Sequence, residues 1–173
     1  KPEVVAQLAD FLPDVIVGIA RGGWVPARIV ADAFPDAELA SLGVAFYTGI
    51  SETEHSPKLT RALTYGIAGR RVLLVDDVAD TGRSLKAAGE NSQRLKPEML
   101  KVATVYKKPN SLTEPDYYGA ETTAWIIFPW EKSESARKLA RKLQVQGLSA
   151  PSIRQYLVRL GLDPEATHAR GAK

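Results

Sequence analysis

The sequence predicts an α/β fold, with a central, mostly parallel β-sheet flanked by helices and a helical C-terminal extension. Within residues 1–130, short continuous apolar runs alternate with helix-like segments, and such runs are typical of strands buried on both faces of a parallel sheet. Beyond residue 132 only helical patterns remain, which predicts the extension. At 173 residues with 45% hydrophobic content, the chain suits one globular domain, residues 1–132, with an appendage, residues 133–173.

The predicted domain begins with an amphipathic helix over residues 3–12, because its apolar side chains fall near one helical face. The polar residues 48–60 predict a mobile loop or a hairpin. The remaining elements are buried strands over 15–19, 71–75, 100–106 and 125–128, a further apolar segment over 41–47, and helices over 24–33 and 83–95.

The extension is predicted to contain two helices and a last short turn at Asp163-Pro164. Ser133 can cap the first helix and Gly147 ends it, while Ser149 can start the second and Gly161 ends that one. Because the apolar residues of this segment are few, we expect it to pack on the domain, on a second subunit or on another molecule. The predicted inward side chains are Ala136, Leu139, Ala140 and Leu143, then Ile153, Tyr156, Leu157 and Leu160.

The composition excludes several classes of site. The sequence has no cysteine, which excludes disulfides, thiolate metal sites and a cysteine nucleophile, and two histidines are too few for a His-rich metal centre. No apolar run approaches the ~20 residues that span a bilayer and no signal-peptide pattern is present, so we expect a cytoplasmic protein without a membrane partner. Residues 131–173 contain 9 Lys and Arg against 4 Asp and Glu, so the extension is basic.

The most informative segment is residues 72–84, where an apolar strand ends in two carboxylates and a polar turn leads into a helix. Ligands of open α/β sheets bind at the carboxyl ends of strands. Asp76 and Asp77 can accept hydrogen bonds from two sugar hydroxyls or hold a hydrated Mg²⁺. The turn can direct backbone N–H groups and the Thr81 and Ser84 hydroxyls at a phosphate. An acidic pair alone is more often a turn former or cap, but the Thr-Gly turn and Asp80 favour the ligand site.

A second segment, Arg21-Gly22-Gly23, follows the first predicted strand. Paired glycines before a helix are by themselves typical of a tight structural turn. A pyrophosphate needs backbone amides that no Cβ obstructs and a fixed cation, and this segment supplies both.

Residues 72–84 resemble the phosphoribosyl diphosphate (PRPP) signature of the type I phosphoribosyltransferases: an apolar strand, two acidic residues, two small or apolar residues, then Asp-Thr-Gly. The resemblance covers residues 13–130 and implies the type I phosphoribosyltransferase fold. It implies that Asp76 and Asp77 bind the ribose 2′- and 3′-hydroxyls and help to position Mg²⁺. Asp80 would act at the purine N7 as general base or acid. The residues that would cradle the 5′-phosphate are Ala79, Asp80, Thr81, Gly82, Arg83 and Ser84.

The glycine segment is similar to the pyrophosphate loop of the same family. This likeness implies that Arg21, Gly22 and Gly23 bind the pyrophosphate, with Arg21 neutralising the leaving group. It also implies a non-proline cis peptide between Ala20 and Arg21. The polar residues 48–60 would form the family's flexible lid, with His55 and Lys58 as candidate lid residues.

Two further segments, residues 106–109 and 125–130, resemble the base pocket of the 6-oxopurine phosphoribosyltransferases of the xanthine–guanine kind. The resemblance implies that Lys108 approaches the purine O6, that Trp125 stacks on the ring, and that the Ile126 backbone meets its exocyclic edge. Lysine is only a donor, so it favours a carbonyl O6 over an amino N6. Ile127 stands where bacterial relatives tend to have an acidic residue, so that extra metal contact is not expected here.

The implied activity is Mg²⁺-dependent transfer of the 5-phosphoribosyl group from PRPP to hypoxanthine, guanine or xanthine, with release of pyrophosphate, as in purine salvage. The family likeness also implies a homodimer. Adenine remains open as the acceptor, because the extension can reshape the base pocket. A second alternative is a PRPP- or nucleotide-sensing regulator whose tail binds DNA, since Gly147-Leu148-Ser149 between two helices resembles half of a helix-turn-helix. The tail is short for such a domain, so nucleic acid is not an expected partner.

Overall fold

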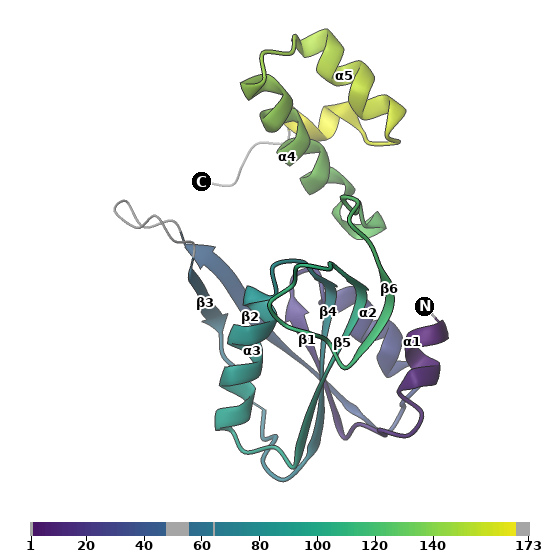
Figure 1. Ribbon diagram of the computed structural model, residues 1–173, viewed down its shortest axis with the longest axis vertical. Helices are drawn as coiled ribbons and strands as arrows, with labels where there is room; N and C mark the ends of the chain where they lie inside the picture. Colours follow the sequence, from purple (N-terminus) through teal and green to yellow (C-terminus); the bar gives the residue numbers. More distant parts are fainter. Residues whose placement is uncertain (1, 48–55, 64, 169–173) are drawn as a thin grey trace. The chain divides into compact units, whose positions relative to one another are not determined.

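The computed structural model describes residues 2–47, 56–63 and 65–168 (Figure 1). Its contacts divide the chain into two compact units, Lys1–Thr123 and Ala124–Lys173. In the first unit a six-stranded sheet has the strand order β3-β2-β1-β4-β5-β6. The strands are β1 (Val15–Ala20), β2 (Glu38–Tyr47), β3 (Ser56–Arg61), β4 (Arg71–Ala79), β5 (Met99–Lys107) and β6 (Tyr117–Glu121).

All neighbouring strands of this sheet are parallel except β2 and β3, which pair antiparallel at one edge. The α/β fold with a mostly parallel sheet is therefore confirmed. The β2–β3 pair is the hairpin that the polar segment suggested as one possibility. Residues 48–55 of that segment, including the candidate lid residue His55, lie outside the described part of the chain, whereas Lys58 lies in β3.

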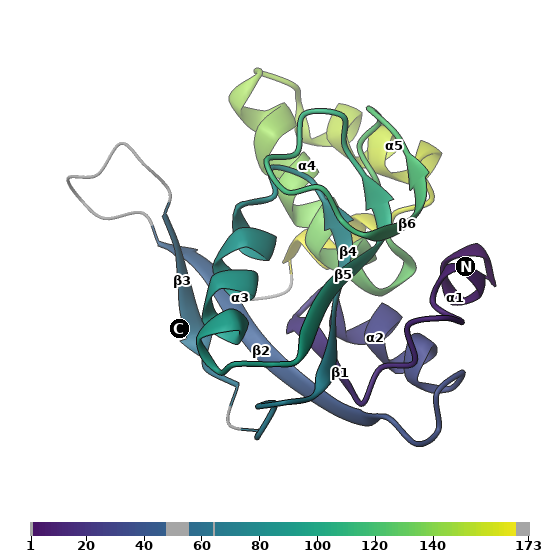
Figure 2. The same cartoon turned by 60° about the horizontal axis from the view of Figure 1, so that its bottom comes forward.

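Helices cover both faces of the sheet (Figures 1 and 2). On one face lie α1 (Pro2–Gln7) and α2 (Trp24–Ala31), and on the other lies α3 (Arg83–Arg94). The strand pleat separates the two cores, because Leu73 and Val75 pack with the α2 side chains Ala27 and Val30. Their neighbours in the strand pack with α3; this second core includes Val72, Leu74, Leu85 and Ala88.

The strands differ from the sequence prediction in two places: one strand was missed and one predicted strand was wrong. Strand β6 was not predicted, because its sequence contains a glycine and two charged or small residues and it lies at the edge, pairing only with β5. Residues 125–128 were predicted as a buried strand but form no strand. Of these, Phe128 is buried and stacks on Trp130, and Ile127 packs on the core of the second unit, so their apolar character serves a different core.

The second unit consists of two helices, α4 (Lys132–Val145) and α5 (Ala150–Arg159), with the short turns η1 (Pro129–Glu131) and η2 (Pro164–His168). Ser149 caps α5 as predicted, accepting a hydrogen bond from the Ser152 amide. Ser133 is not a cap, because α4 begins one residue earlier. This unit has a small core of its own, contrary to the sequence expectation, formed by Ala136, Leu139, Leu157 and Leu162. Two predicted inward side chains, Tyr156 and Leu160, are instead exposed.

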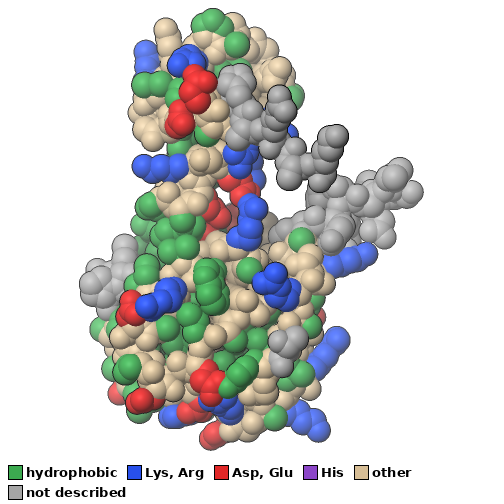
Figure 3. Space-filling model, turned by 180° about the vertical axis from the view of Figure 1, so that it is seen from behind, with side chains coloured by type: hydrophobic (Ala, Val, Ile, Leu, Met, Phe, Trp, Pro, Cys, Tyr) green, Lys and Arg blue, Asp and Glu red, His purple; other side chains and the backbone are tan. Residues whose placement is uncertain are grey.

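Charged side chains of both signs are spread over the face of the first unit seen in Figure 3 rather than collected into a patch of one sign. Among the described residues, no helix is long and apolar enough to cross a membrane. At the amino end of the sheet, Asp14 forms an ion pair with Arg71, whose guanidinium and backbone N–H both donate to the carboxylate. This pairing joins the start of β4 to the turn before β1.

Candidate active site

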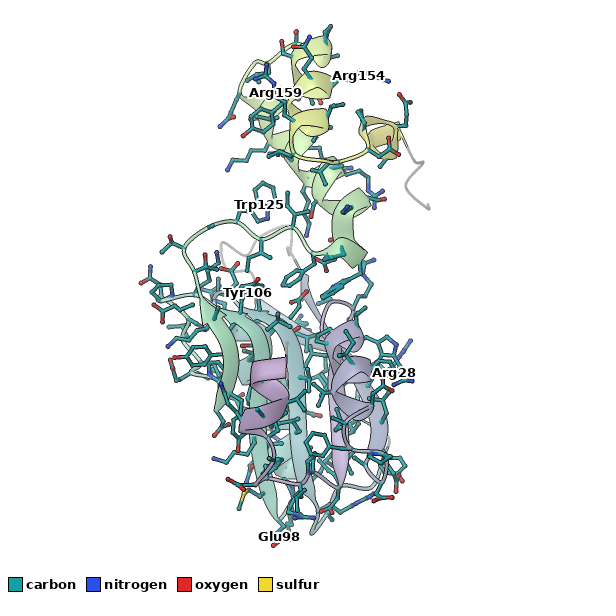
Figure 4. The ribbon with its side chains drawn as sticks, turned by 90° about the vertical axis from the view of Figure 1, so that its right-hand side faces the viewer. Arg28, Glu98, Tyr106, Trp125, Arg154 and Arg159 are labelled. Carbon is teal, nitrogen blue, oxygen red and sulfur yellow. The ribbon has the colours of Figure 1, made fainter. Side chains whose placement is uncertain are left out.

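The sequence-predicted ligand residues of the first unit lie at the carboxyl edge of the sheet. Strands β1, β4 and β5 end close to one level there, since Val75 is opposite Gly18 and Ala79 is opposite Lys107. Figure 4 shows Tyr106 at this edge and Glu98, which precedes β5, at the other. The segments that follow these strands therefore converge, as ligand-binding segments of open α/β sheets do.

The acidic pair, Asp76 and Asp77, lies near the end of β4, and each residue is only 8% exposed. The Asp77 amide donates a 2.9 Å hydrogen bond to Asp76 Oδ1. Carboxylate oxygens accept hydrogen bonds from hydroxyl groups and are ligands that Mg²⁺ commonly takes from a protein. The acidic pair is therefore suited to bind a cation or a polyhydroxyl ligand.

The glycine loop, residues 21–23, lies directly against the acidic pair. A Cβ added at Gly22 would lie 2.2 Å from Asp77 Oδ2, and one at Gly23 would lie 2.4 Å from the Val75 carbonyl oxygen. Both contacts are shorter than real Cβ atoms allow. At Gly23 the atoms in the way belong to the backbone, so glycine is required there, whereas a side chain at position 22 would displace the Asp77 carboxylate. The peptide bond between Ala20 and Arg21 is cis, as the family resemblance implied. The glycine loop and the acidic pair are thus in direct contact.

The phosphate turn, residues 79–84, connects β4 to α3. Gly82 occupies the N-cap position of α3 with a φ of 75°, the left-handed conformation that glycine adopts most readily. A Cβ at Gly82 would also lie 2.5 Å from the Thr113 amide nitrogen, so backbone packs on backbone at this point. The N-terminal N–H groups of a 12-residue helix follow the turn, an arrangement that favours a bound anion.

A pocket of about 470 Å³ lies between the phosphate turn and the loop of residues 108–113, which follows β5. The loop is attached to the turn by backbone hydrogen bonds, from the Lys108 amide to the Ala79 carbonyl at 2.9 Å and from the Leu112 amide to the Thr81 carbonyl at 3.1 Å. The structure therefore brings Asp80 and Lys108 to the same pocket. Its lining residues are Asp80, Thr81, Arg83, Lys108, Pro109, Asn110, Leu112 and Thr123.

The two adjacent lysines of this region differ in their surroundings. Lys107 Nζ lies 2.5 Å from Glu114 Oε1 and 3.4 Å from Glu121 Oε2, and its side chain is nearly buried. The hydrogen bond to Glu114 is the main cause that raises the pKa of Lys107. Lys108 lines the pocket instead. Of the two, Lys108 is therefore the one that can meet a ligand there.

The described residues contain no cluster of three or more His, Asp or Glu side chains placed to hold a metal. A magnesium ion needs no such cluster, because it commonly takes one or two protein carboxylates and completes its shell with water and substrate oxygens. The acidic pair, buried beside the glycine loop, fits that requirement. These two residues are the ones in the described site that could hold the ion.

The remaining predicted base-binding residues, Trp125 and Ile126, belong to the second unit. Trp125 is 54% exposed. Their contact with a purine stays a prediction.

Comparison with known proteins identifies the family. Residues 3–137 match the family model described as the phosphoribosyl transferase domain. The chain belongs to the phosphoribosyltransferase family. It is 32% identical over 118 residues to the xanthine-guanine phosphoribosyltransferase of Gluconobacter oxydans, covering 67% of each chain. The similar enzyme of Nitratidesulfovibrio vulgaris is 34% identical over 121 residues, covering 67% of this chain and 68% of that one.

A solved structure of a phosphoribosyltransferase supports the same assignment. The purine phosphoribosyltransferase of Pyrococcus horikoshii is 38% identical, with a TM-score of 0.68 over 74% of this chain and 83% of that chain. As a phosphoribosyltransferase, the chain is an enzyme of a generally Mg²⁺-dependent family.

Sequence reasoning missed three residues that line the pocket of this phosphoribosyltransferase: Asn110, Leu112 and Thr123. The run Pro-Asn-Ser after a buried strand indicates a turn at the ligand-binding edge. That signal locates the loop, but it does not reveal that the loop folds back onto a turn far away in the sequence.

Proposed function

We propose that this phosphoribosyltransferase transfers the 5-phosphoribosyl group from PRPP to a 6-oxopurine, giving the nucleoside 5′-monophosphate and pyrophosphate. The bond from the anomeric carbon to the pyrophosphate oxygen breaks, the bond to the purine nitrogen forms, and the purine loses one proton. The xanthine-guanine specificity of the curated relatives supports the choice of acceptor.

The proposal assigns the PRPP groups to three surfaces of the first unit. The acidic pair accepts hydrogen bonds from the ribose 2′- and 3′-hydroxyls. The glycine loop receives the pyrophosphate on its backbone amides, with Arg21 as the cation. The phosphate turn, including Arg83 and Ser84, receives the 5′-phosphate at the N-terminus of α3.

Positive charge develops at the anomeric carbon as pyrophosphate leaves, so the surroundings of that carbon determine the rate. Asp76 and Asp77 would hold Mg²⁺, which when bound neutralises charge on the leaving pyrophosphate. Arg21 adds a fixed positive charge on the same group. Asp80, in the phosphate turn, would accept the proton that the purine releases, or return it in the reverse reaction.

The acceptor preference depends on Lys108. Its ammonium group is only a donor, and it lines the same pocket as Asp80. A carbonyl at purine position 6 accepts from it, whereas the amino group of adenine offers no acceptor. In this proposal Trp125 stacks on the ring and Ile126 meets the exocyclic edge through its backbone.

The observation that supports the proposal most directly is the close fit between Gly22 and Asp77, since a Cβ on Gly22 would lie 2.2 Å from Asp77 Oδ2. In this proposal the glycine loop binds pyrophosphate directly beside the pair that binds the hydroxyls and the cation, the combination that PRPP requires. A homodimer and a cytoplasmic location stay predictions from the sequence.

The test is incubation of the full chain with PRPP and Mg²⁺ and, in parallel, hypoxanthine, guanine, xanthine, adenine, uracil or orotate, followed by chromatography of the nucleotides. We expect turnover with at least one 6-oxopurine and a loss of that preference in Lys108→Ala. Turnover with adenine alone would contradict the role of Lys108. Failure with all six acceptors while PRPP still binds would favour a sensor.

A further inference from the structure

The loop of residues 108–113 donates hydrogen bonds to three carbonyl groups of the phosphate turn. The Lys108 and Leu112 amides bind the carbonyls of Ala79 and Thr81, and the Thr113 hydroxyl donates to the Gly82 carbonyl at 2.9 Å. Thr113 and Gly82 are 31 residues apart in the sequence, and their bond is partly buried. Two of the three bonds use backbone donors, whereas the third depends on the threonine side chain and shares the Gly82 carbonyl with the Lys86 amide, which donates to it at 2.9 Å.

The direction of each of these carbonyl groups also determines where the N–H group of the next residue points. In a planar trans peptide, the carbonyl group and the following N–H point in opposite directions. The amides that follow the three held carbonyls belong to Asp80, Gly82 and Arg83. They are therefore turned away from the loop. The Arg83 amide donates to Thr81 Oγ1 at 3.5 Å, which is a long hydrogen bond.

The loop is itself fixed at both ends. Lys107, the last residue of β5, forms the ion pair with Glu114 that closes the loop at its base. The Thr122 amide also donates to the Lys107 carbonyl at 3.0 Å. Within the loop, the Ser111 hydroxyl donates to the Thr113 carbonyl at 2.9 Å. A fixed loop can orient the turn it contacts, because its donors are held in place before a ligand arrives.

We propose that Thr113 is a positioning residue for the 5′-phosphate: its hydroxyl, which holds the Gly82 carbonyl together with the Lys86 amide, helps to direct the Arg83 amide toward the phosphate. The inference rests on the proposed function, in which that turn receives the 5′-phosphate. Thr113 itself touches no reacting atom. Its loss therefore weakens affinity for ligands that have a 5′-phosphate and leaves affinity for pyrophosphate, which binds at the glycine loop, unchanged.

The test compares wild type, Thr113→Val and Thr113→Ser, with Thr60→Val as the matched control. Thr60 is an exposed residue of β3, at the opposite edge of the sheet. In Thr113→Val we expect the KM for PRPP and the Kd for GMP to rise about three- to tenfold, the effect of one lost hydrogen bond. The Kd for pyrophosphate should stay within about twofold by the same arithmetic. Thr113→Ser should restore the wild-type values, and Thr60→Val should not depart from them.

Calorimetric titration with GMP and with pyrophosphate separates the outcomes. An unchanged Kd for GMP in Thr113→Val, or an equal loss for both ligands in a folded variant, would overturn the positioning role. If Thr113→Val does not fold, the same titrations of Thr113→Ala decide. A wild-type chain that binds GMP but forms no nucleotide would overturn the proposed function alone, because the comparison of Kd values still tests Thr113.

Discussion

Replacing Gly22 by alanine tests whether the contact between the glycine loop and the acidic pair is essential for activity. The new Cβ would lie 2.2 Å from Asp77 Oδ2 and 2.7 Å from its Cγ, whereas ordinary contacts begin near 3.4 Å. The Asp77 carboxylate or the loop must therefore shift by about 1 Å. A misplacement of that size in a catalytic site lowers the rate by about 10²-fold, so we expect kcat/KM for PRPP to fall about 100-fold, or roughly 2.7 kcal/mol.

The assay is steady-state nucleotide formation with guanine in excess and PRPP varied. Gly66→Ala is the matched control, because a Cβ at that position would meet no described atom within 4 Å. It should keep wild-type kinetics. A folded Gly22→Ala variant with wild-type kcat/KM would refute the reasoning, since it would mean that the close fit of the loop on Asp77 plays no part in binding PRPP.

Three further predictions concern the chemistry and the stability of the fold. Asp80→Asn should lower kcat about 10²- to 10⁴-fold while the KM for PRPP changes little, because a general base is lost; equal turnover would remove Asp80 from the chemistry. Arg71 lowers the pKa of Asp14 from 3.8 to about 2, so this carboxylate stabilises the fold above about pH 4 and the contribution disappears as the pH falls toward 2. The pair is about one-third exposed, which limits the contribution to less than about 1 kcal/mol. The free energy of unfolding should therefore change less between pH 7 and pH 2 in Asp14→Asn than in wild type, and the same change in both proteins would contradict the pairing. Gly89 lies within α3, and a Cβ at this position would have no close contacts. Gly89→Ala should therefore raise the free energy of unfolding by about 0.5–1 kcal/mol and leave the activity unchanged. A lower thermal midpoint would show that the added methyl group does not fit there.

Local patterns predicted most of the fold and much of the site. A buried strand followed by the acidic pair and the phosphate turn is encoded within residues 72–84, and each step depends on neighbours in the sequence. The glycine loop is equally local. Since parallel strands align their carboxyl ends, the fold class alone was enough to bring these segments together.

The features that sequence reasoning missed depend on contacts between distant residues. The bond from Thr113 to Gly82 joins two loops that no periodicity relates. Edge strand β6 obtains its hydrogen bonds from β5 rather than from strong strand propensity. Residues 125–128 have the composition of a strand, but burial of Phe128 and packing of Ile127 in the second unit determine their conformation.

The central claim is transfer of a phosphoribosyl group to a purine, and ³¹P NMR of one reaction tests it most directly. The sample contains the full chain, PRPP, Mg²⁺ and guanine. We predict that the PRPP signals decline while GMP and pyrophosphate appear in equal amounts, and that Gly22→Ala slows both together. Formation of pyrophosphate with ribose 5-phosphate instead of GMP, or unchanged PRPP with every 6-oxopurine, would contradict the account.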